Sequence, residues 1–133
     1  MENESLGKVL IVDDSRAMRM ILRRTVTELG YSCCEAGNGQ EALEVLAREA
    51  QVSLMLVDWN MPVMCGLDLV KAVRADSRFA GIPLVMVTTE TEIDRISQAL
   101  EAGANEYVMK PFTKEVLEGK LRSMNLIPQK EAL

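Results

Sequence analysis

The stretch from Leu54 to Pro62 constrains the fold more than any other part of the chain. Its first four residues, Leu-Met-Leu-Val, are apolar without interruption and lead directly to Asp58. A strand that is apolar on both faces must be covered on both sides, so a ligand can reach it only beyond its carboxyl end. Asp58 is expected at that end, and Pro62 then keeps the following loop out of helical geometry. Asp58 is thus a candidate ligand-binding group, although turn formation is the commoner role of a single aspartate.

Three further short and mostly apolar runs also end at polar side chains that can take part in chemistry. They are Val9–Val12 before Asp13 and Asp14, Leu84–Val87 before Thr88, and residues 106–109 before Lys110. Each run is short and rich in β-branched or long apolar residues, as buried strands are. A less regular strand is predicted over 31–36. The chain therefore contains five predicted strands.

Between the strands, apolar residues recur with helical spacing. The first helix is predicted over about 15–29, with Gly30 ending it and an apolar face of Met18, Ile21, Leu22, Val26 and Leu29. Asn38 and Glu41 form an N-cap pair for the second. A third helix is predicted to contain Leu67, Val70 and Val73, and a fourth helix to contain Ile93, Ile96 and Leu100. Thr113 can cap a fifth that carries Val116, Leu117, Leu121 and Met124.

Five strands that alternate with five helices, without hairpin signals, predict an α/β fold. The right-handed crossovers of such a chain place helices on both faces of a doubly wound parallel sheet. All strands then end at the same edge, where the five polar residues converge: Asp13, Asp14, Asp58, Thr88 and Lys110. Their separation in the sequence does not matter.

Composition narrows the classes of function. The 133 residues suffice for one domain with a full hydrophobic core. The 15 basic and 20 acidic residues give a net charge of −5, which argues against nucleic acid as a partner. The absence of histidine excludes Ser-His-Asp and Cys-His nucleophiles. The three cysteines, without a histidine to complete a zinc site, are expected to be reduced structural thiols.

The amino-terminal residues predict a cytoplasmic protein. Residues 1–4, Met-Glu-Asn-Glu, are acidic where a secretory signal would be basic. No apolar run approaches the roughly 18 residues that a helix needs to cross a bilayer. We therefore expect neither a membrane partner nor secretion.

The converging residues suit phosphoryl transfer. Carboxylates that crowd together repel one another unless a cation compensates, and Mg²⁺ prefers oxygen ligands from one or two carboxylates plus phosphate. Asp13 and Asp14 meet that demand together with a loop carbonyl. Asp58 is then free to attack phosphorus and form an acyl phosphate. Lys110 can offset charge on a phosphoryl oxygen while the Thr88 hydroxyl hydrogen-bonds to another.

These residues resemble the receiver domains of response regulators, most of all the stand-alone chemotaxis regulators of the CheY type. The resemblance spans nearly the whole chain and implies the strand order 2-1-3-4-5. Four ordered motifs carry it: Val12-Asp13-Asp14-Ser15, Val57-Asp58-Trp59-Asn60-Met61-Pro62, Met86-Val87-Thr88-Thr89 and Tyr107-Val108-Met109-Lys110-Pro111-Phe112.

The resemblance also implies roles for single residues. A sensor histidine kinase would phosphorylate Asp58, with Mg²⁺ held by Asp13, Asp14, Asp58 and the main-chain carbonyl of Asn60. Thr88 and Tyr107 would switch the face made by the fourth helix, the fifth strand and the fifth helix. Asn60 and Glu90 match positions that tune hydrolysis of the acyl phosphate. The protein would thus be a signalling switch that catalyses only its own phosphorylation and dephosphorylation.

The organisation implied is a single receiver domain over 1–133, with a core of about 7–126 and no output domain. We expect a monomer that binds a target protein after phosphorylation. The basic stripe of Arg16, Arg19, Arg23 and Arg24 is either a kinase-facing surface or a solvated helix surface. Lys120 matches a basic position of the family, although a single surface lysine is usually solvated.

Two other functions remain open at the level of sequence. The protein can be a phosphorelay intermediate that donates to a histidine phosphotransferase. A Mg²⁺-dependent phosphatase with an aspartyl-phosphate intermediate is less favoured, because Asp58-Trp59-Asn60 lacks the second aspartate of the Asp-x-Asp motif. Glu92 and Ile93 stand where enteric chemotaxis regulators have a basic pair, which puts a flagellar switch partner in doubt.

Overall fold

The computed structural model describes residues 5–49, 51–89 and 94–128. Within them lies one five-stranded parallel sheet with five α-helices. The strands are β1 (Lys8–Val12), β2 (Ser32–Ala36), β3 (Val52–Asp58), β4 (Leu84–Thr88) and β5 (Glu106–Met109). The helices are α1 (Arg16–Leu29), α2 (Gly39–Arg48), α3 (Gly66–Ala75), α4 (Ile96–Ala102) and α5 (Lys114–Ser123).

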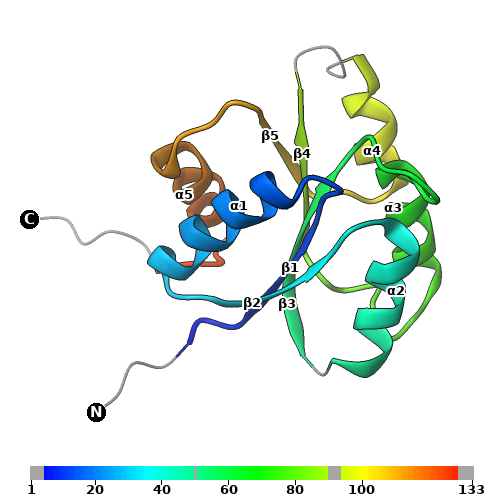
Figure 1. Cartoon of the computed structure of the whole chain (residues 1–133), viewed down its shortest axis with the longest axis horizontal. Helices are drawn as coiled ribbons and strands as arrows, with labels where there is room; N and C mark the ends of the chain where they lie inside the picture. Colours follow the sequence, from blue (N-terminus) through cyan, green and yellow to red (C-terminus); the bar gives the residue numbers. More distant parts are fainter. Residues whose placement is uncertain (1–4, 50, 90–93, 129–133) are drawn as a thin grey trace, which may run out of the picture.

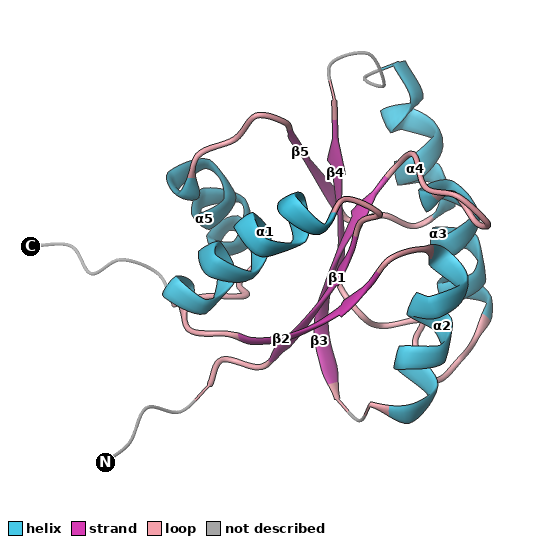
Figure 2. Ribbon diagram, in the orientation of Figure 1, coloured by secondary structure: helices cyan, strands magenta, loops and turns pink. Residues whose placement is uncertain are grey.

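The sheet is the middle layer of a three-layer sandwich. Its strand order is β2-β1-β3-β4-β5, and every neighbouring pair is parallel. Helices α1 and α5 cover one face, and α2, α3 and α4 cover the other (Figure 1). Coloured by secondary structure, the sheet runs between the two groups of helices (Figure 2). The predicted doubly wound fold and strand order are confirmed.

The central strands are buried on both faces, as their uninterrupted apolar sequences predict. In β3, Leu54 and Leu56 pack with the helices of the α1 side, whereas Met55 and Val57 pack with those of the α2 side. All four are fully buried. Because side chains alternate across a strand, a continuous apolar run fits only a sheet with two covered faces.

The helix termini follow the predicted capping residues. Asn38 accepts a hydrogen bond from the Glu41 amide at 2.8 Å, and Thr113 accepts one from the Val116 amide at 3.1 Å. Gly30 ends α1 with a φ of 112°, a left-handed conformation that glycine adopts without a Cβ penalty. These local contacts satisfy amides and carbonyls that a helix end would otherwise leave unpaired.

The predicted apolar faces of the first and last helices are partly wrong. Ile21 and Val116 are 52% and 48% exposed, although both were predicted to lie on the apolar face of their helix. Each lies one residue before the residue that does face the sheet, Leu22 in α1 and Leu117 in α5. One residue turns the helix by about 100°, which is enough to move a side chain from the buried stripe to its flank.

Gly66, the first residue of α3, lets that helix begin close to the end of β3. Its amide donates to the Trp59 carbonyl at 2.8 Å. A Cβ at this position would overlap the Asp58 carbonyl oxygen and lie 2.9 Å from Met86 Cε. Because Gly66 has no side chain, the start of α3 can lie directly against the backbone of Asp58 and Trp59.

We predict that Gly66→Ala lowers the free energy of unfolding by about 1–3 kcal/mol, because backbone around Asp58 must shift to admit the methyl group. Gly119→Ala is the matched control, since a Cβ at this exposed position of α5 meets nothing within 4 Å. It should raise stability by about 0.5–1 kcal/mol through helix propensity. Urea unfolding measures both, and equal stability of the two variants would contradict the close approach at Gly66.

Candidate functional site

The carboxyl ends of four strands meet at one edge of the sheet. Val12 pairs with Val57 in the β1–β3 register, so Asp13 and Asp58 follow side by side. Asp58 pairs with Val87, which places Thr88 one residue further along β4. Thr88 in turn pairs with Met109, and Lys110 follows directly. The register thus brings together the polar residues that the sequence predicts to converge.

Three carboxylates form the centre of this site. Asp13, Asp14 and Asp58 each present an oxygen within 4.8 Å of the others. Asp13 is 1% exposed and Asp58 7%, whereas Asp14 is exposed. Oxygen ligands at such mutual distances suit a hard cation such as Mg²⁺, with the exposed side left for water or phosphate oxygens.

Lys110 compensates the charge of the two buried carboxylates. Its Nζ lies 3.2 Å from Asp13 Oδ2 and 3.1 Å from Asp58 Oδ1, and its side chain is 17% exposed. Burial lowers the pKa of Lys110, but attraction to Asp58 and Asp13 outweighs it, so the pKa is raised above 10.5. The lysine is therefore charged at neutral pH and links the ends of β1, β3 and β5.

Thr88 contributes a buried hydroxyl at the same edge of the sheet as the carboxylates. The residue is 0% exposed, and its Oγ1 has no hydrogen-bond partner among the described residues. Its carbonyl accepts from the Lys110 amide at 2.6 Å, which ties the ends of β4 and β5 together. A buried polar atom without a partner is costly, so this hydroxyl is poised to bond to a ligand.

The structure also assigns positions to the remaining predicted site residues. Asn60 lies two residues beyond Asp58 and is exposed. Tyr107 is half-buried on β5 and packs against the apolar cluster of the α2 side. Glu90 lies outside the described residues.

Three basic residues of the helices make contacts that the sequence did not predict. The basic stripe on α1 is not uniform: Arg19 and Arg23 both pair with Glu35 on β2, and Arg19 also donates to the Asp13 carbonyl. Lys120 is not simply solvated, because its Nζ lies 4.7 Å from the centroid of the Tyr107 ring. Spacing within one helix cannot reveal such contacts between elements.

Fold and site together define a doubly wound α/β protein with a charge-compensated acidic cluster at the carboxyl edge of its sheet. A family model described as the response regulator receiver domain matches residues 9–122. The chain therefore belongs to the response regulator receiver domain family.

Individual relatives agree with this assignment. The chain is 51% identical over 115 residues to the chemotaxis protein CheY1 of Helicobacter pylori, covering 86% of this chain and 93% of the relative. It is 44% identical over 118 residues to the chemotaxis protein CheY of Pseudomonas aeruginosa, covering 88% and 94%. The crystal structure of Vibrio cholerae CheY4 superposes with a TM-score of 0.81 at 37% identity, covering 88% and 97%.

Among the helices that the structure describes, none combines the length and the apolar character needed to cross a membrane.

We predict that Lys110→Met lowers the free energy of unfolding by about 1.5–3 kcal/mol at neutral pH, because two largely buried carboxylates lose their charged donor. Since the folded-state pKa is raised, the lysine stabilises the fold fully below pH 10.5 and loses this effect as the pH rises through the higher folded-state value. The difference between wild type and variant should therefore narrow at alkaline pH.

Urea titrations between pH 7 and 11 measure this difference. Lys71→Met, which removes an exposed lysine of α3, serves as the control for loss of a positive charge. An equal effect of the two substitutions would show that Lys110 does not stabilise the acidic cluster.

Proposed function

We propose that this protein is a response regulator that accepts a phosphoryl group on Asp58 from a sensor histidine kinase. The observation that carries the proposal is the bridging of Asp13 and Asp58 by Lys110 within a cluster of three carboxylates. A single aspartate at a strand end would be explained by a turn. A nearly buried aspartate that shares a lysine with a second acid requires a role for its charge.

Each residue of the site has its own role in the proposed phosphoryl transfer. A carboxylate oxygen of Asp58 attacks phosphorus, the bond from phosphorus to the donor histidine breaks, and the imidazole leaves with a proton. Lys110 moves from pairing with carboxylates to pairing with a phosphoryl oxygen. Mg²⁺ on Asp13, Asp14, Asp58 and the Asn60 carbonyl would, when bound, neutralise charge on the other phosphoryl oxygens.

Thr88 and Tyr107 couple this site to a binding surface. The side chains of Thr88 and Met86 project from the same face of β4. Met86 is the register partner of Tyr107 on the neighbouring strand β5. When the Thr88 hydroxyl turns towards the phosphoryl group, it leaves space on the face of the sheet where Tyr107 packs. The added charge of about −1.5 to −2 thereby biases the face formed by α4, β5 and α5.

The output is binding to another protein, and the pathway is chemotaxis. Support for this pathway comes from the relatives named as chemotaxis proteins, of which the chain covers more than nine tenths. The protein is a switch whose chemistry is confined to gaining and losing its own phosphoryl group. Asn60 and Glu90 tune how long that group persists.

We predict that incubation with acetyl phosphate and Mg²⁺ adds one phosphoryl group, detected by intact mass. Asp58→Asn should abolish the addition because an amide cannot form the acyl phosphate. Asp68→Asn, at an exposed position of α3, should label like wild type. Chelation of Mg²⁺ should also prevent labelling.

Two results would count against the proposed function. One is labelling of Asp58→Asn to the wild-type extent, and the other is sustained turnover of diverse phosphate monoesters by the wild type.

A further inference from the structure

Arg19 joins α1 to the ends of two strands. Its Nη1 donates to the Asp13 carbonyl at 2.6 Å, and its Nε donates to Glu35 Oε1 on β2 at 2.9 Å. The side chain is 19% exposed. The planar guanidinium is therefore held at two points, and its orientation is restricted.

With the Arg19 contact, the amide, the carbonyl and both carboxylate oxygens of Asp13 all take part in hydrogen bonds. The Asp13 amide donates to the Ala36 carbonyl at 3.1 Å. Asp13 Oδ1 accepts from the Ser15 amide at 2.8 Å, and Oδ2 from Lys110 at 3.2 Å. Only the carbonyl belongs to the peptide group that joins Asp13 to Asp14. Because a peptide group is planar, a hydrogen bond to this carbonyl also sets the direction in which the Asp14 backbone leaves.

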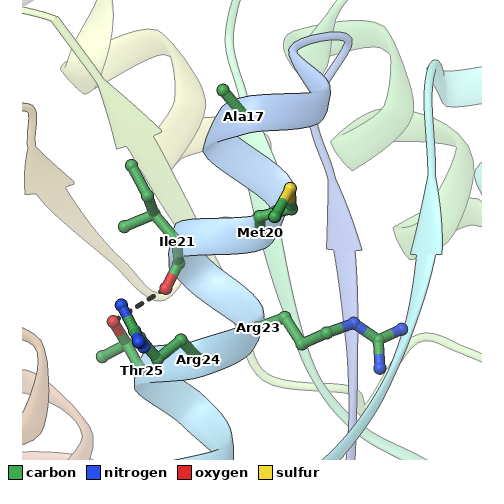
Figure 3. A pocket seen from close by; sticks show the side chains of 6 residues that line it. All are labelled: Ala17, Met20, Ile21, Arg23, Arg24 and Thr25. Carbon is green, nitrogen blue, oxygen red and sulfur yellow. Dashed lines mark hydrogen bonds between the residues drawn. The ribbon is translucent and has the colours of Figure 1, made fainter.

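Glu35 anchors the arginine from the opposite side. Burial raises the pKa of Glu35, but hydrogen bonds from Arg23 and Arg19 outweigh it and hold the pKa below its usual range. Glu35 is thus ionised at neutral pH and balances the charge of Arg19. Figure 3 shows Arg23 extending from α1 towards β2, where its Nε lies 2.6 Å from Glu35 Oε2. Arg23 also binds Glu35 but, within the described part of the chain, forms no hydrogen bond to Asp13.

We propose that Arg19 is a positioning residue that orients the Asp13–Asp14 peptide group so that both carboxylates face a divalent cation. The inference rests on the proposed function, because the cation is the one needed for phosphorylation of Asp58. Arg19 touches neither cation nor phosphoryl group and acts through the backbone of Asp13. Residues that orient metal ligands in this way typically contribute about 10–100-fold to metal affinity.

A purely electrostatic role makes the opposite prediction. A positive charge close to the acidic cluster repels a divalent cation, so its removal would tighten cation binding. Orientation of the peptide group predicts that removal weakens binding. The sign of the change therefore separates the two roles.

The test is a Mg²⁺ titration followed by the fluorescence of Trp59, the only tryptophan of the chain and the neighbour of Asp58. Arg19→Met should raise the dissociation constant about tenfold or more. Arg23→Met removes an equivalent ion pair with Glu35 but leaves the Asp13 carbonyl contact, so it should bind Mg²⁺ like wild type. Tighter or unchanged binding by Arg19→Met would overturn the inference.

Phosphorylation kinetics provide a second readout. With acetyl phosphate, Arg19→Met should need a higher Mg²⁺ concentration for half-maximal rate, while its rate at saturating Mg²⁺ approaches that of wild type. A lower rate at saturation with an unchanged half-maximal concentration would also overturn a positioning role. A general loss of stability would affect Arg23→Met to the same degree.

Arg19→Lys keeps the positive charge but cannot reproduce the two-point hydrogen bonding of a guanidinium. It should bind Mg²⁺ more weakly than wild type, and it decides the question if Arg19→Met does not fold. Wild-type affinity in Arg19→Lys would refute the proposal. If the wild type itself neither responds to Mg²⁺ nor accepts a phosphoryl group, the proposed function fails as well, whereas a normal wild type with an unaffected Arg19→Met refutes only the role of Arg19.

Discussion

The contact of Lys110 with Asp13 and Asp58 is the interaction on which the site depends. Two carboxylates that are nearly excluded from water would repel each other and lose hydration without a cation between them. Lys110 supplies that cation from a strand that is distant in sequence. A parallel sheet makes this possible, because its strands end at one edge irrespective of their order in the chain. Under the proposed function, the same charge would pair with a phosphoryl oxygen once the carboxylates hold a metal ion.

The rest of the structure holds this edge in place and connects it to the surface. Gly66 lets α3 start against the Asp58 backbone, and Arg19 holds the Asp13 carbonyl from α1. Thr88 presents a buried hydroxyl that has no hydrogen-bond partner among the described residues, on the face of the sheet that Tyr107 packs against. Under the proposed function, a group that binds at this edge would draw the Thr88 hydroxyl towards it, and the Tyr107 ring would follow. The proposed switch would alter a protein-binding face through the protein's own phosphorylation.

Much of this arrangement was predictable from the sequence because it is encoded locally. Uninterrupted apolar runs predict strands with two covered faces, and caps such as Asn38 and Thr113 act within four residues. The convergence of the site residues follows from parallel topology alone. Contacts between elements were not predictable: Lys120 lies over the Tyr107 ring, and Arg19 reaches Glu35, through geometry that helical spacing does not contain. The exposure of Ile21 was not predictable either, because the spacing of apolar residues along a helix does not determine which of them lie at the margin of its buried face.

The most direct test of the central claim is to identify the residue that carries the phosphoryl group. An acyl phosphate is reduced by borohydride to a primary alcohol, so phosphorylated aspartate becomes homoserine and can be located by peptide mass spectrometry. After treatment with acetyl phosphate and Mg²⁺, homoserine should occur at position 58 and at neither Asp13 nor Asp14. Homoserine at Asp13 or Asp14, or its absence from the labelled protein, would contradict the assignment of Asp58 as the nucleophile that Lys110 and the neighbouring acids serve.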